Sequence, residues 1–528
     1  MNRLYFGDCL TIMEGMNKGS VDLIYLDPPF NSQRDYNAIY KDETGRPLPT
    51  QIEAFSDMWS MNEERERELR TMPVLMREAG IADESVEFWR LWMNALRRTN
   101  PNLLAYLSYM TQRLLPMKSI LKPTGSLFLH CDPTASHYIK VMLDSIFGHD
   151  NFRSEIVWKR TSAHSDAKGF GQVCDYLLYY AGNSRTWNPI TVPHDPQYVA
   201  DAYRHKDERG RYRHHEIIRT ASMGERPNLS YEYKGYTPRW GWRMVREKLE
   251  ELDAQGLLIW SSKGRPYRKT YLADGQAPTN LWIDIPGALG GERLGYSTQK
   301  PVALLERIIK TSTQPGDTVF DPFCGCATTL EAAHRLGRRW IGIDIAIHAV
   351  KRVAALRLRD RLALKEGEDF EIDGVPRDLE GARVLWSRDK YHFQRWAVEQ
   401  VDGFVTTKRT ADGGIDGRLY FGLPNDKDLS SMAIEVKGGR NVGIKDVREL
   451  AAVLENDDAL MAGLIVLEPF GPTKERNARQ FMARAGDLDV MGVKYARMQI
   501  LTVAEILEGK RFHTPGVAGR GLAEPKLI

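Results

Sequence analysis

Two short turns that lie far apart in the chain each follow an apolar, strand-like run. Residues 21–26 lead into Asp27-Pro28-Pro29-Phe30, and residues 317–320 lead into Asp321-Pro322-Phe323-Cys324-Gly325. A polar turn directly after a buried strand lies at the carboxyl edge of an α/β sheet, which is where such folds bind ligands. The sequence therefore predicts an α/β fold whose ligand site draws on both turns.

The first turn combines groups that suit a flat base with an exocyclic amine. Such an amine is a poor nucleophile because its lone pair is delocalised into the ring, so catalysis needs acceptors that hold it near tetrahedral geometry. Asp27 offers a carboxylate and Pro28 a backbone carbonyl, and Pro29 further restricts the backbone that aims them. Phe30 offers a face on which a base that has left the duplex can stack. The alternative is an ordinary Asp-Pro-Pro turn.

The second turn is a tight, glycine-containing turn before a helix, which suits a nucleotide-like cofactor. Asp344 ends the next predicted strand, residues 339–344, where an acid can accept hydrogen bonds from ribose hydroxyls. Taken singly, each of these acids is more often a cap or turn residue.

The composition is that of an ordinary folded protein. A length of 528 residues predicts two to four domains. There is no run of 18 apolar residues, which argues against a membrane span, and the N-terminus shows no signal peptide, so we expect a cytoplasmic protein. Five cysteines without a CxxC pair indicate neither a disulfide framework nor a zinc site. The net charge of +3 means that any nucleic-acid surface must come from local clustering.

Changes of pattern along the chain predict five segments. These are a catalytic half at 1–157, an insert at 158–290, a cofactor-binding half at 291–365, a linker at 366–389 with some strand content, and a separate α/β domain at 390–528. Within the first segment, a charged helix is expected from residue 62 to residue 70, stopped by Pro73.

The insert is rich in interleaved basic and aromatic residues, which can contact phosphates, base edges and unstacked bases. The alternative is a solvated, tyrosine-rich insert. The residues concerned are Arg209, Arg211, Arg213, His214, His215, Arg219, Tyr231, Tyr233, Lys234, Tyr236, Arg239, Trp240, Trp242 and Arg243.

A second candidate site lies near the C-terminus. Asp416 follows a Gly-Gly-Ile segment and is expected at the end of one strand, and strand alternation puts Glu435 and Lys437 on one face of another. Two carboxylates and a lysine on adjacent strands can bind Mg²⁺ through Asp416 and Glu435 and orient a water against a phosphodiester. Exposed alternating charges on a strand would look the same.

The two turns, catalytic turn first, resemble those of the permuted β class of DNA amino-methyltransferases. Residues 103–160 resemble the adenine-modifying subunits of type III restriction systems. The resemblance implies a Rossmann-like, S-adenosyl-L-methionine-dependent fold, double-stranded DNA as substrate, base flipping, and a target-recognition role for the insert. An aspartate at the start of the first turn implies adenine N6, whereas cytosine N4 enzymes more often start it with serine.

The same resemblance assigns the cofactor residues. Asp8 is placed near the adenine of the cofactor, and Ala327 stands where the family usually has glycine, which reduces backbone freedom there. The remaining assigned residues lie at the entry of a flanking helix, in the second turn and after the next strand, and they are Thr298, Lys300, Pro301, Asp321, Phe323, Gly325, Thr328 and Asp344.

The C-terminal segment resembles the Mrr-like branch of the PD-(D/E)xK nucleases, which implies catalytic roles for Asp416, Glu435 and Lys437. Where many such domains carry a glutamate on the preceding helix, this chain has Gln394, with Glu399 as a substitute. No Walker-type ATP-binding motif is present, so any translocase or restriction subunit would be a separate chain, and a homodimer is compatible with the class. Two alternatives stay open: a methyltransferase with a silent, DNA-binding C-terminal domain, and a non-catalytic DNA-binding regulator.

Overall fold

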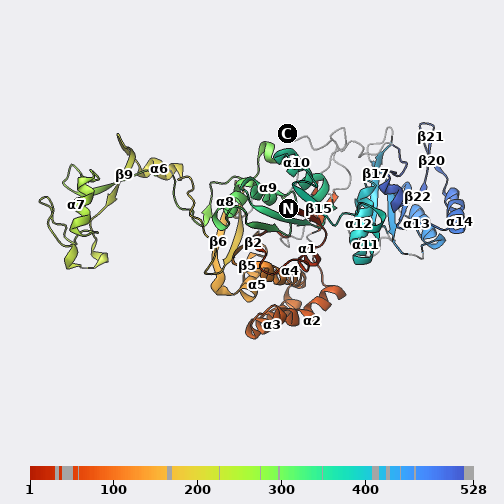
Figure 1. Cartoon of the computed structure of the whole chain (residues 1–528), viewed down its shortest axis with the longest axis horizontal. Helices are drawn as coiled ribbons and strands as arrows, with labels where there is room; N and C mark the ends of the chain where they lie inside the picture. The colour runs from red at the N-terminus through yellow and green to blue at the C-terminus, as the bar shows by residue number, and fades with distance from the viewer. Residues whose placement is uncertain are drawn as a thin grey trace. The chain divides into compact units, whose positions relative to one another are not determined.

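The chain forms two compact units, Met1–Asn188 with Asn280–Ile528, and Pro189–Thr279 (Figure 1). The computed structural model describes residues 1–29, 35–38, 52–56, 59–162, 169–224, 226–273, 275–294, 298–347, 349–406, 415–423, 429–439, 442–456 and 459–515. Among these residues, no helix is both long and apolar enough to cross a membrane.

A nine-stranded sheet is the centre of the first unit. Its order is β12-β6-β7-β5-β2-β13-β14-β1-β15, with β7 antiparallel to both of its neighbours and the other pairs parallel. The strands are β1 Asn2–Phe6, β2 Val21–Leu26, β5 Leu121–Cys131, β6 Phe152–Lys159, β7 Cys174–Ala181, β12 Leu281–Trp282, β13 Thr318–Asp321, β14 Arg339–Asp344 and β15 Phe370–Asp373. A separate hairpin pairs β3 Asp35–Ala38 with β4 Ile52–Ser56.

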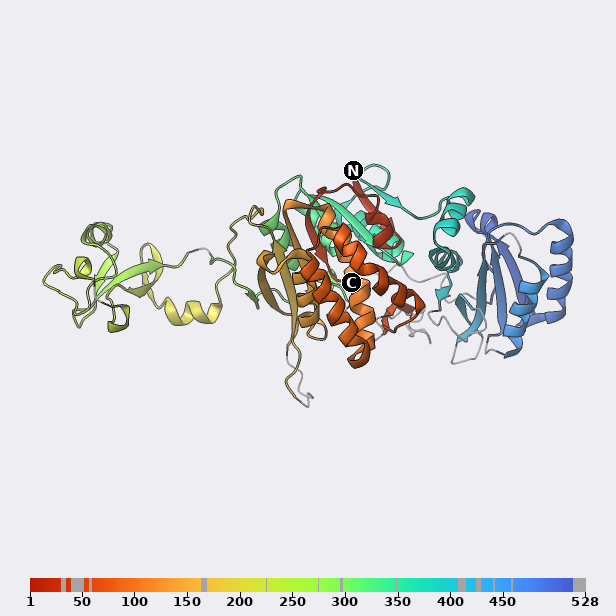
Figure 2. The same cartoon turned by 90° about the horizontal axis from the view of Figure 1, so that it is seen from below.

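Helices cover both faces of this sheet (Figures 1 and 2). On one face lie α1 Cys9–Met13, α2 Glu63–Glu78, α3 Asp83–Thr99, α4 Pro101–Ile120 and α5 Ser136–Phe147. On the other lie α8 Val302–Ser312, α9 Thr328–Arg335, the π-helix η5 Ala349–Ala354 and α10 Ala355–Leu362. Because both faces of the sheet are covered, every residue of β2 and β13 is buried, and burial does not alternate along these strands.

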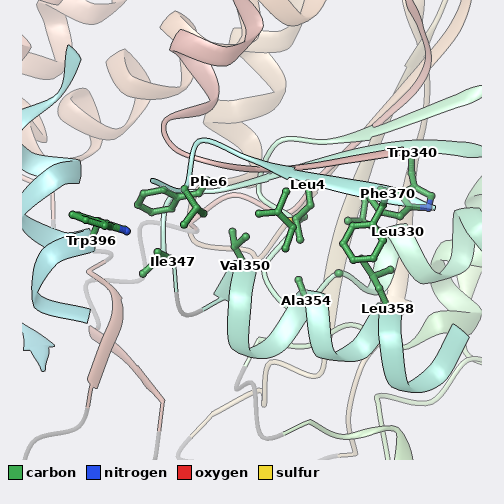
Figure 3. Close-up of a cluster of buried hydrophobic side chains, with 14 of the residues drawn as sticks. Leu4, Phe6, Leu330, Trp340, Ile347, Val350, Ala354, Leu358, Phe370 and Trp396 are labelled. Atoms are coloured by element: carbon green, nitrogen blue, oxygen red, sulfur yellow. The ribbon is translucent and has the colours of Figure 1, made fainter. Parts of the chain in front are cut away.

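The second helical layer packs on β1 and its neighbours. Leu4 and Phe6 of β1 face Val350 and Ala354, and all four side chains are buried (Figure 3). Trp396 belongs to the same hydrophobic cluster, although it lies in the C-terminal domain. The core of the first unit is therefore continuous from the nine-stranded sheet into that domain.

The C-terminal domain is built on a second sheet of order β16-β17-β18-β19-β22. Strands β18, β19 and β22 are parallel, and β16 and β17 pair antiparallel. The elements are α11 Leu379–Arg388, α12 Lys390–Gln400, β16 Phe404–Val405, β17 Gly417–Gly422, β18 Leu429–Lys437, α13 Ile444–Asn456, β19 Met461–Val466, α14 Pro472–Met482, the hairpin β20 Asp487–Val490 with β21 Val493–Ala496, β22 Met498–Thr502 and α15 Val503–Leu507.

The second unit contains a four-stranded antiparallel sheet of order β10-β11-β9-β8. Its elements are α6 Pro196–Ala202, β8 His205–Asp207, β9 Gly210–Glu216, α7 Arg246–Ala254, β10 Leu258–Trp260 and β11 Pro266–Tyr271. Short 3-10 helices complete the described chain: η1 His149–Asn151, η2 Ala221–Met223, η3 Pro227–Leu229, η4 Gly290–Glu292 and η6 Ala483–Ala485.

Three expected boundaries differ from the structure. The compact unit is narrower than the insert expected at 158–290, because β7 and β12 pair within the nine-stranded sheet. The linker expected at 366–389 contains β15, the edge strand beside β1, and α11. Helix α2 also continues through Pro73 to Glu78, with Met72 and Met76 fully buried on its packed face. This apolar burial offsets the backbone hydrogen bond that proline cannot donate.

Several aromatic residues of the insert form a small core, whereas others, such as Trp187 and Tyr198, are exposed. Trp242 is fully buried against Ile217 and Leu249, and Tyr231 and Tyr236 pack around it. The indole N–H of Trp242 donates to the Tyr231 carbonyl at 2.8 Å. Trp242 and the tyrosines packed around it therefore stabilise the unit.

Candidate functional site

Four neighbouring strands of the nine-stranded sheet deliver a carboxylate to the same edge. Asp27 follows β2, Asp321 ends β13, Asp344 ends β14, and Asp8 follows β1 by two residues. The strands are parallel, with Phe6 in register with Asp344 and Phe320 with Ile24, so their carboxyl ends meet. All four side chains line one pocket.

The pocket brings together most of the residues predicted from the sequence. Among those lining it are Asp8, Asp27, Pro28, Pro29, Thr298, Lys300, Asp321, Phe323, Gly325, Thr328 and Asp344. Pro301 does not line the pocket and instead caps the N-terminus of α8. Phe30 lies outside the described residues.

Asp27 has one carboxylate oxygen engaged and one open. The Lys300 ammonium donates to Asp27 Oδ2 at 2.5 Å and to the Thr298 carbonyl at 3.3 Å. Asp27 Oδ1 is buried and has no hydrogen-bond partner among the described residues. Because a buried carboxylate oxygen without a donor is costly, this oxygen is an acceptor ready for a donor that enters the pocket.

The second turn is tied to the end of β14. Asp344 accepts hydrogen bonds from the backbone N–H of Gly325 at 2.9 Å and of Ala346 at 2.8 Å. Ala327, which replaces the usual glycine, adopts a left-handed conformation with φ of +60° as the N-cap of α9. Buried Arg357 holds the turn from behind through the Cys326 carbonyl at 3.2 Å.

Burial shifts the acid–base behaviour of this carboxylate group. Desolvation raises the pKa of Asp321 to about 7, with Asp27 and Asp344 adding to the rise and hydrogen bonds from Thr329 and the Phe323 N–H opposing it. Burial also raises the pKa of Asp344 above its usual range. A site that crowds carboxylates in this way favours a positively charged ligand.

Asp321 gives a pH-dependent stability prediction. Its folded pKa of about 7 lies above the unfolded value of about 3.9, so the stability it contributes is lost as pH rises between these values. Replacing Asp321 with asparagine removes this loss, because an amide side chain does not ionise. Asparagine also keeps an acceptor for the Phe323 N–H, which Asp321 binds at 3.0 Å. We expect the melting temperature of the cofactor-free variant to exceed that of the wild type by more at pH 8 than at pH 5. Equal differences at both pH values would contradict the raised pKa.

Residues that carry no sequence motif complete the pocket. Tyr109 of α4 lines it, and the buried Arg113 guanidinium lies 3.4 Å from the centre of the Tyr109 ring. Arg113 also donates to Asp8 Oδ2 at 2.5 Å, and Asp8 Oδ1 caps α1 through the Leu10 N–H. Asp8 therefore anchors α1 and α4. The i,i+4 spacing of Tyr109 and Arg113 is the only signal that could have suggested their contact.

A buried polar chain lies behind Asp27. Tyr25 lines the pocket, and its hydroxyl is 3.0 Å from Nδ1 of His130, whose Nε2 is 3.1 Å from Asp175 Oδ2. Burial lowers the pKa of His130, assisted by the charge of Lys300. A neutral imidazole that donates to Asp175 leaves Nδ1 to accept from Tyr25, which fixes the tyrosine ring in the pocket wall.

The second candidate site lies where β17 begins beside the end of β18. Asp416 precedes β17, not at the end of a strand as expected, and its Oδ2 accepts from the Val436 N–H at 2.7 Å. Glu435 and Lys437 share one face of β18, and the Lys437 ammonium is 2.5 Å from Glu435 Oε1. Because β17 and β18 are antiparallel, the start of β17 lies beside the end of β18. Asp416, directly before β17, is therefore close to Glu435 and Lys437.

Both carboxyl groups are held in an environment that disfavours their charge. Desolvation raises the pKa of Asp416 to about 6, and desolvation together with Asp416 and Glu449 raises the pKa of Glu435 to about 7. A divalent cation would relieve this cost, so the pair fits Mg²⁺. Glu449 of α13 is an acid whose charge adds to the raised pKa of Glu435. In the described parts of the chain, no group of three His, Cys, Asp or Glu side chains is arranged to hold a metal ion.

The fold and the pocket define a Rossmann-like α/β protein with a ligand site at the carboxyl edge of its sheet. The chain belongs to the DNA methylase family, whose match covers residues 21–355. A second family, described as restriction endonuclease, matches residues 388–493, so the C-terminal part is a restriction-endonuclease-like domain.

Two curated relatives extend this assignment. The type II methyltransferase M.EcaI of Enterobacter cloacae is 36% identical over 262 residues, which are 47% of this chain and 56% of the relative. The Mod subunit of the type III restriction-modification enzyme StyLTI of Salmonella typhimurium (strain LT2) is 27% identical over 359 residues, 63% of this chain and 50% of the relative. The chain thus spans about half the length of these relatives.

Among solved structures, the PvuII DNA methyltransferase, which is cytosine-N4-specific, is 14% identical with a TM-score of 0.34 and covers 70% of this chain and 88% of its own.

Proposed function

We propose that this chain transfers a methyl group from S-adenosyl-L-methionine to the N6 amine of an adenine flipped out of double-stranded DNA. The observation that carries the proposal is Asp27, whose Oδ2 is held by Lys300 while its buried Oδ1 has no partner in the described part of the chain. An exocyclic amine supplies the N–H that this oxygen lacks. Membership of the DNA methylase family supports a base in DNA as the molecule that carries the amine.

The pocket fits a cationic methyl donor. Four carboxylates line it, and burial raises the pKa of two of them, Asp321 and Asp344. When bound, S-adenosyl-L-methionine supplies a methyl group on a positively charged sulfur, so transfer forms an N–C bond, breaks a C–S bond and leaves a neutral thioether. Asp344 would hold the ribose hydroxyls, because each of its oxygens keeps a lone pair beyond its backbone hydrogen bond.

The residues of the chain act on the amine. Asp27 Oδ1 and the Pro28 carbonyl accept its two N–H groups, which localises the nitrogen lone pair for attack. Lys300 keeps Asp27 oriented through Oδ2. After transfer the amine loses one proton, which Asp27 can accept and pass to water.

We propose adenine rather than cytosine as the target base because the turn starts with Asp27 and not with serine. The test is nucleoside mass spectrometry of duplex DNA incubated with the protein and isotope-labelled S-adenosyl-L-methionine. We expect label in N6-methyladenine. Label in N4-methylcytosine would overturn the choice of base, and unlabelled DNA would overturn methyl transfer itself.

The C-terminal domain is proposed to be a Mg²⁺-dependent endonuclease. Asp416 and Glu435 would hold the ion, which supplies charge stabilisation at the phosphodiester, and Lys437 would orient the attacking water. The relationship to a Mod subunit supports a separate partner subunit, and the proposed site of action is the cytoplasm. We also propose a homodimer, on the basis of the resemblance alone.

A second candidate function for this domain is DNA binding without cleavage. The finding that favours it is that the described residues contain no group of three side chains arranged to hold a metal. Strand scission that requires Mg²⁺ would exclude this candidate, and DNA binding without scission under all metal conditions would support it.

A further inference from the structure

The two faces of the four-stranded sheet in residues 189–279 differ in how their charges are paired. Antiparallel register sets Lys206 opposite Arg211 and His215 opposite Arg268, and alternation puts these side chains and Arg213 on one face. The other face carries Tyr212 and His214 of β9 and Lys269 of β11, among others.

On that other face the charges are neutralised within the sheet. Lys269 pairs with Asp207 at 2.7 Å, and Arg265 pairs with Glu216 at 2.8 Å. The rings stack on one another, with the centres of His205 and His214 3.9 Å apart and nearly parallel. The two ion pairs therefore balance the charges of Lys269 and Arg265 within the unit.

The first face is different, because its cations have no acidic partner. Lys206, Arg211, Arg213 and Arg268, with neighbouring Arg243, form what we call the arginine face. None of these five makes an ion pair with a carboxylate among the described residues, and four of them are exposed; Arg213 is half-buried. Arg213 Nε is buried and has no hydrogen-bond partner among the residues that the structure describes.

The guanidinium groups lie close enough to act on a common neighbour. Burial lowers the pKa of His215, and the charges of Arg213, Arg268 and Arg243 lower it further, with Glu216 opposing them weakly. Clustered like charges without counter-charges raise the free energy of the unit unless an anion binds.

We propose that the arginine face binds the phosphate groups of duplex DNA, while the opposite face of the sheet does not contact the backbone. The cations extend over β8, β9 and β11, which spans about 10 Å at the usual strand spacing. A polyanion matches such a spread better than a single small anion does. Phosphate contacts of this kind set the position of a protein on the duplex without reading sequence. The proposal rests on the proposed function in taking DNA as the substrate.

The test compares two double variants of the full-length protein that remove the same charge from the same sheet. Arg211→Gln with Arg268→Gln alters the arginine face, and Arg265→Gln with Lys269→Gln alters the opposite face. Binding of a fluorescent 30-base-pair duplex is measured by anisotropy over a range of salt concentrations. For the first variant we expect roughly tenfold weaker binding and a salt slope lower by about 2, since two phosphate contacts are lost. The control variant is expected to keep the wild-type slope.

Two further arms make the result specific. Replacing Arg211 and Arg268 with lysine keeps both charges and is expected to restore most of the affinity. S-adenosyl-L-methionine binding by calorimetry is expected to be unchanged in every variant. A wild-type slope in the Arg211→Gln, Arg268→Gln variant would overturn the arginine face and leave the proposed function standing. A wild-type protein that binds no duplex would overturn both. If the Arg211→Gln, Arg268→Gln variant lost affinity only for a single-stranded RNA measured in the same assay, duplex DNA would be the wrong partner.

Discussion

Replacing Asp27 with asparagine is expected to lower the turnover number for methyl transfer by about 10²–10³-fold. Asparagine preserves the size of the side chain and one acceptor oxygen, but it removes the negative charge that Lys300 orients at 2.5 Å. The open Oδ1 would no longer be a charged acceptor for the amine N–H. Transfer of labelled methyl groups to duplex DNA, at saturating concentrations of both substrates, measures the effect.

A matched control comes from the other end of the same strand. Asp22 is buried, accepts from Lys122 at 2.7 Å and from the Thr318 N–H at 2.9 Å, and does not line the pocket. Asp22→Asn is expected to lower the melting temperature while methyl transfer continues. If Asp27→Asn retained more than a tenth of wild-type turnover, the assignment of Asp27 as the amine acceptor would be wrong.

Replacing Lys437 with alanine is expected to reduce Mg²⁺-dependent DNA cleavage by about 10²-fold or more. Lys437 lies 2.5 Å from Glu435 Oε1 on the face of β18 that Asp416 approaches, so its loss removes the group that would orient water beside the metal. Supercoiled plasmid incubated with Mg²⁺ measures nicking and linearisation.

The control for this variant is Lys510→Ala, which removes an exposed lysine from the same domain and breaks its pair with Glu505. Its cleavage rate is expected to match the wild type. Cleavage by Lys437→Ala at the wild-type rate would remove Lys437 from the active site, whereas loss of cleavage in both variants would indicate general damage to the domain.

Local patterns predicted the parts of the first site that depend on neighbouring residues in the sequence. Strands β2 and β14 span the predicted residues 21–26 and 339–344, and the predicted turns follow β2 and β13. Because parallel strands end at one edge, the pocket followed from these positions once the strands paired side by side.

Features that depend on tertiary packing could not be read in this way. Pro73 indicates a helix end, but buried Met72 and Met76 keep α2 intact beyond it. Trp242 and its neighbouring tyrosines have the composition of a nucleic-acid surface, yet they fill the core of a unit too small to bury much else. Asp416 lies before β17 and not at the end of a strand. Its proximity to Glu435 depends on the pairing of β17 with β18, which the alternation of side chains along one strand does not specify.

We propose that one chain carries two separable active sites, and treatment of plasmid DNA tests this proposal. Wild type, Asp27→Asn and Lys437→Ala would each be incubated with unmethylated plasmid, with and without Mg²⁺ and S-adenosyl-L-methionine, and then scored for strand breaks and for N6-methyladenine. We expect methylation without cleavage by Lys437→Ala and Mg²⁺-dependent cleavage without methylation by Asp27→Asn. Loss of both activities in either variant, or neither activity in the wild type, would contradict the proposal.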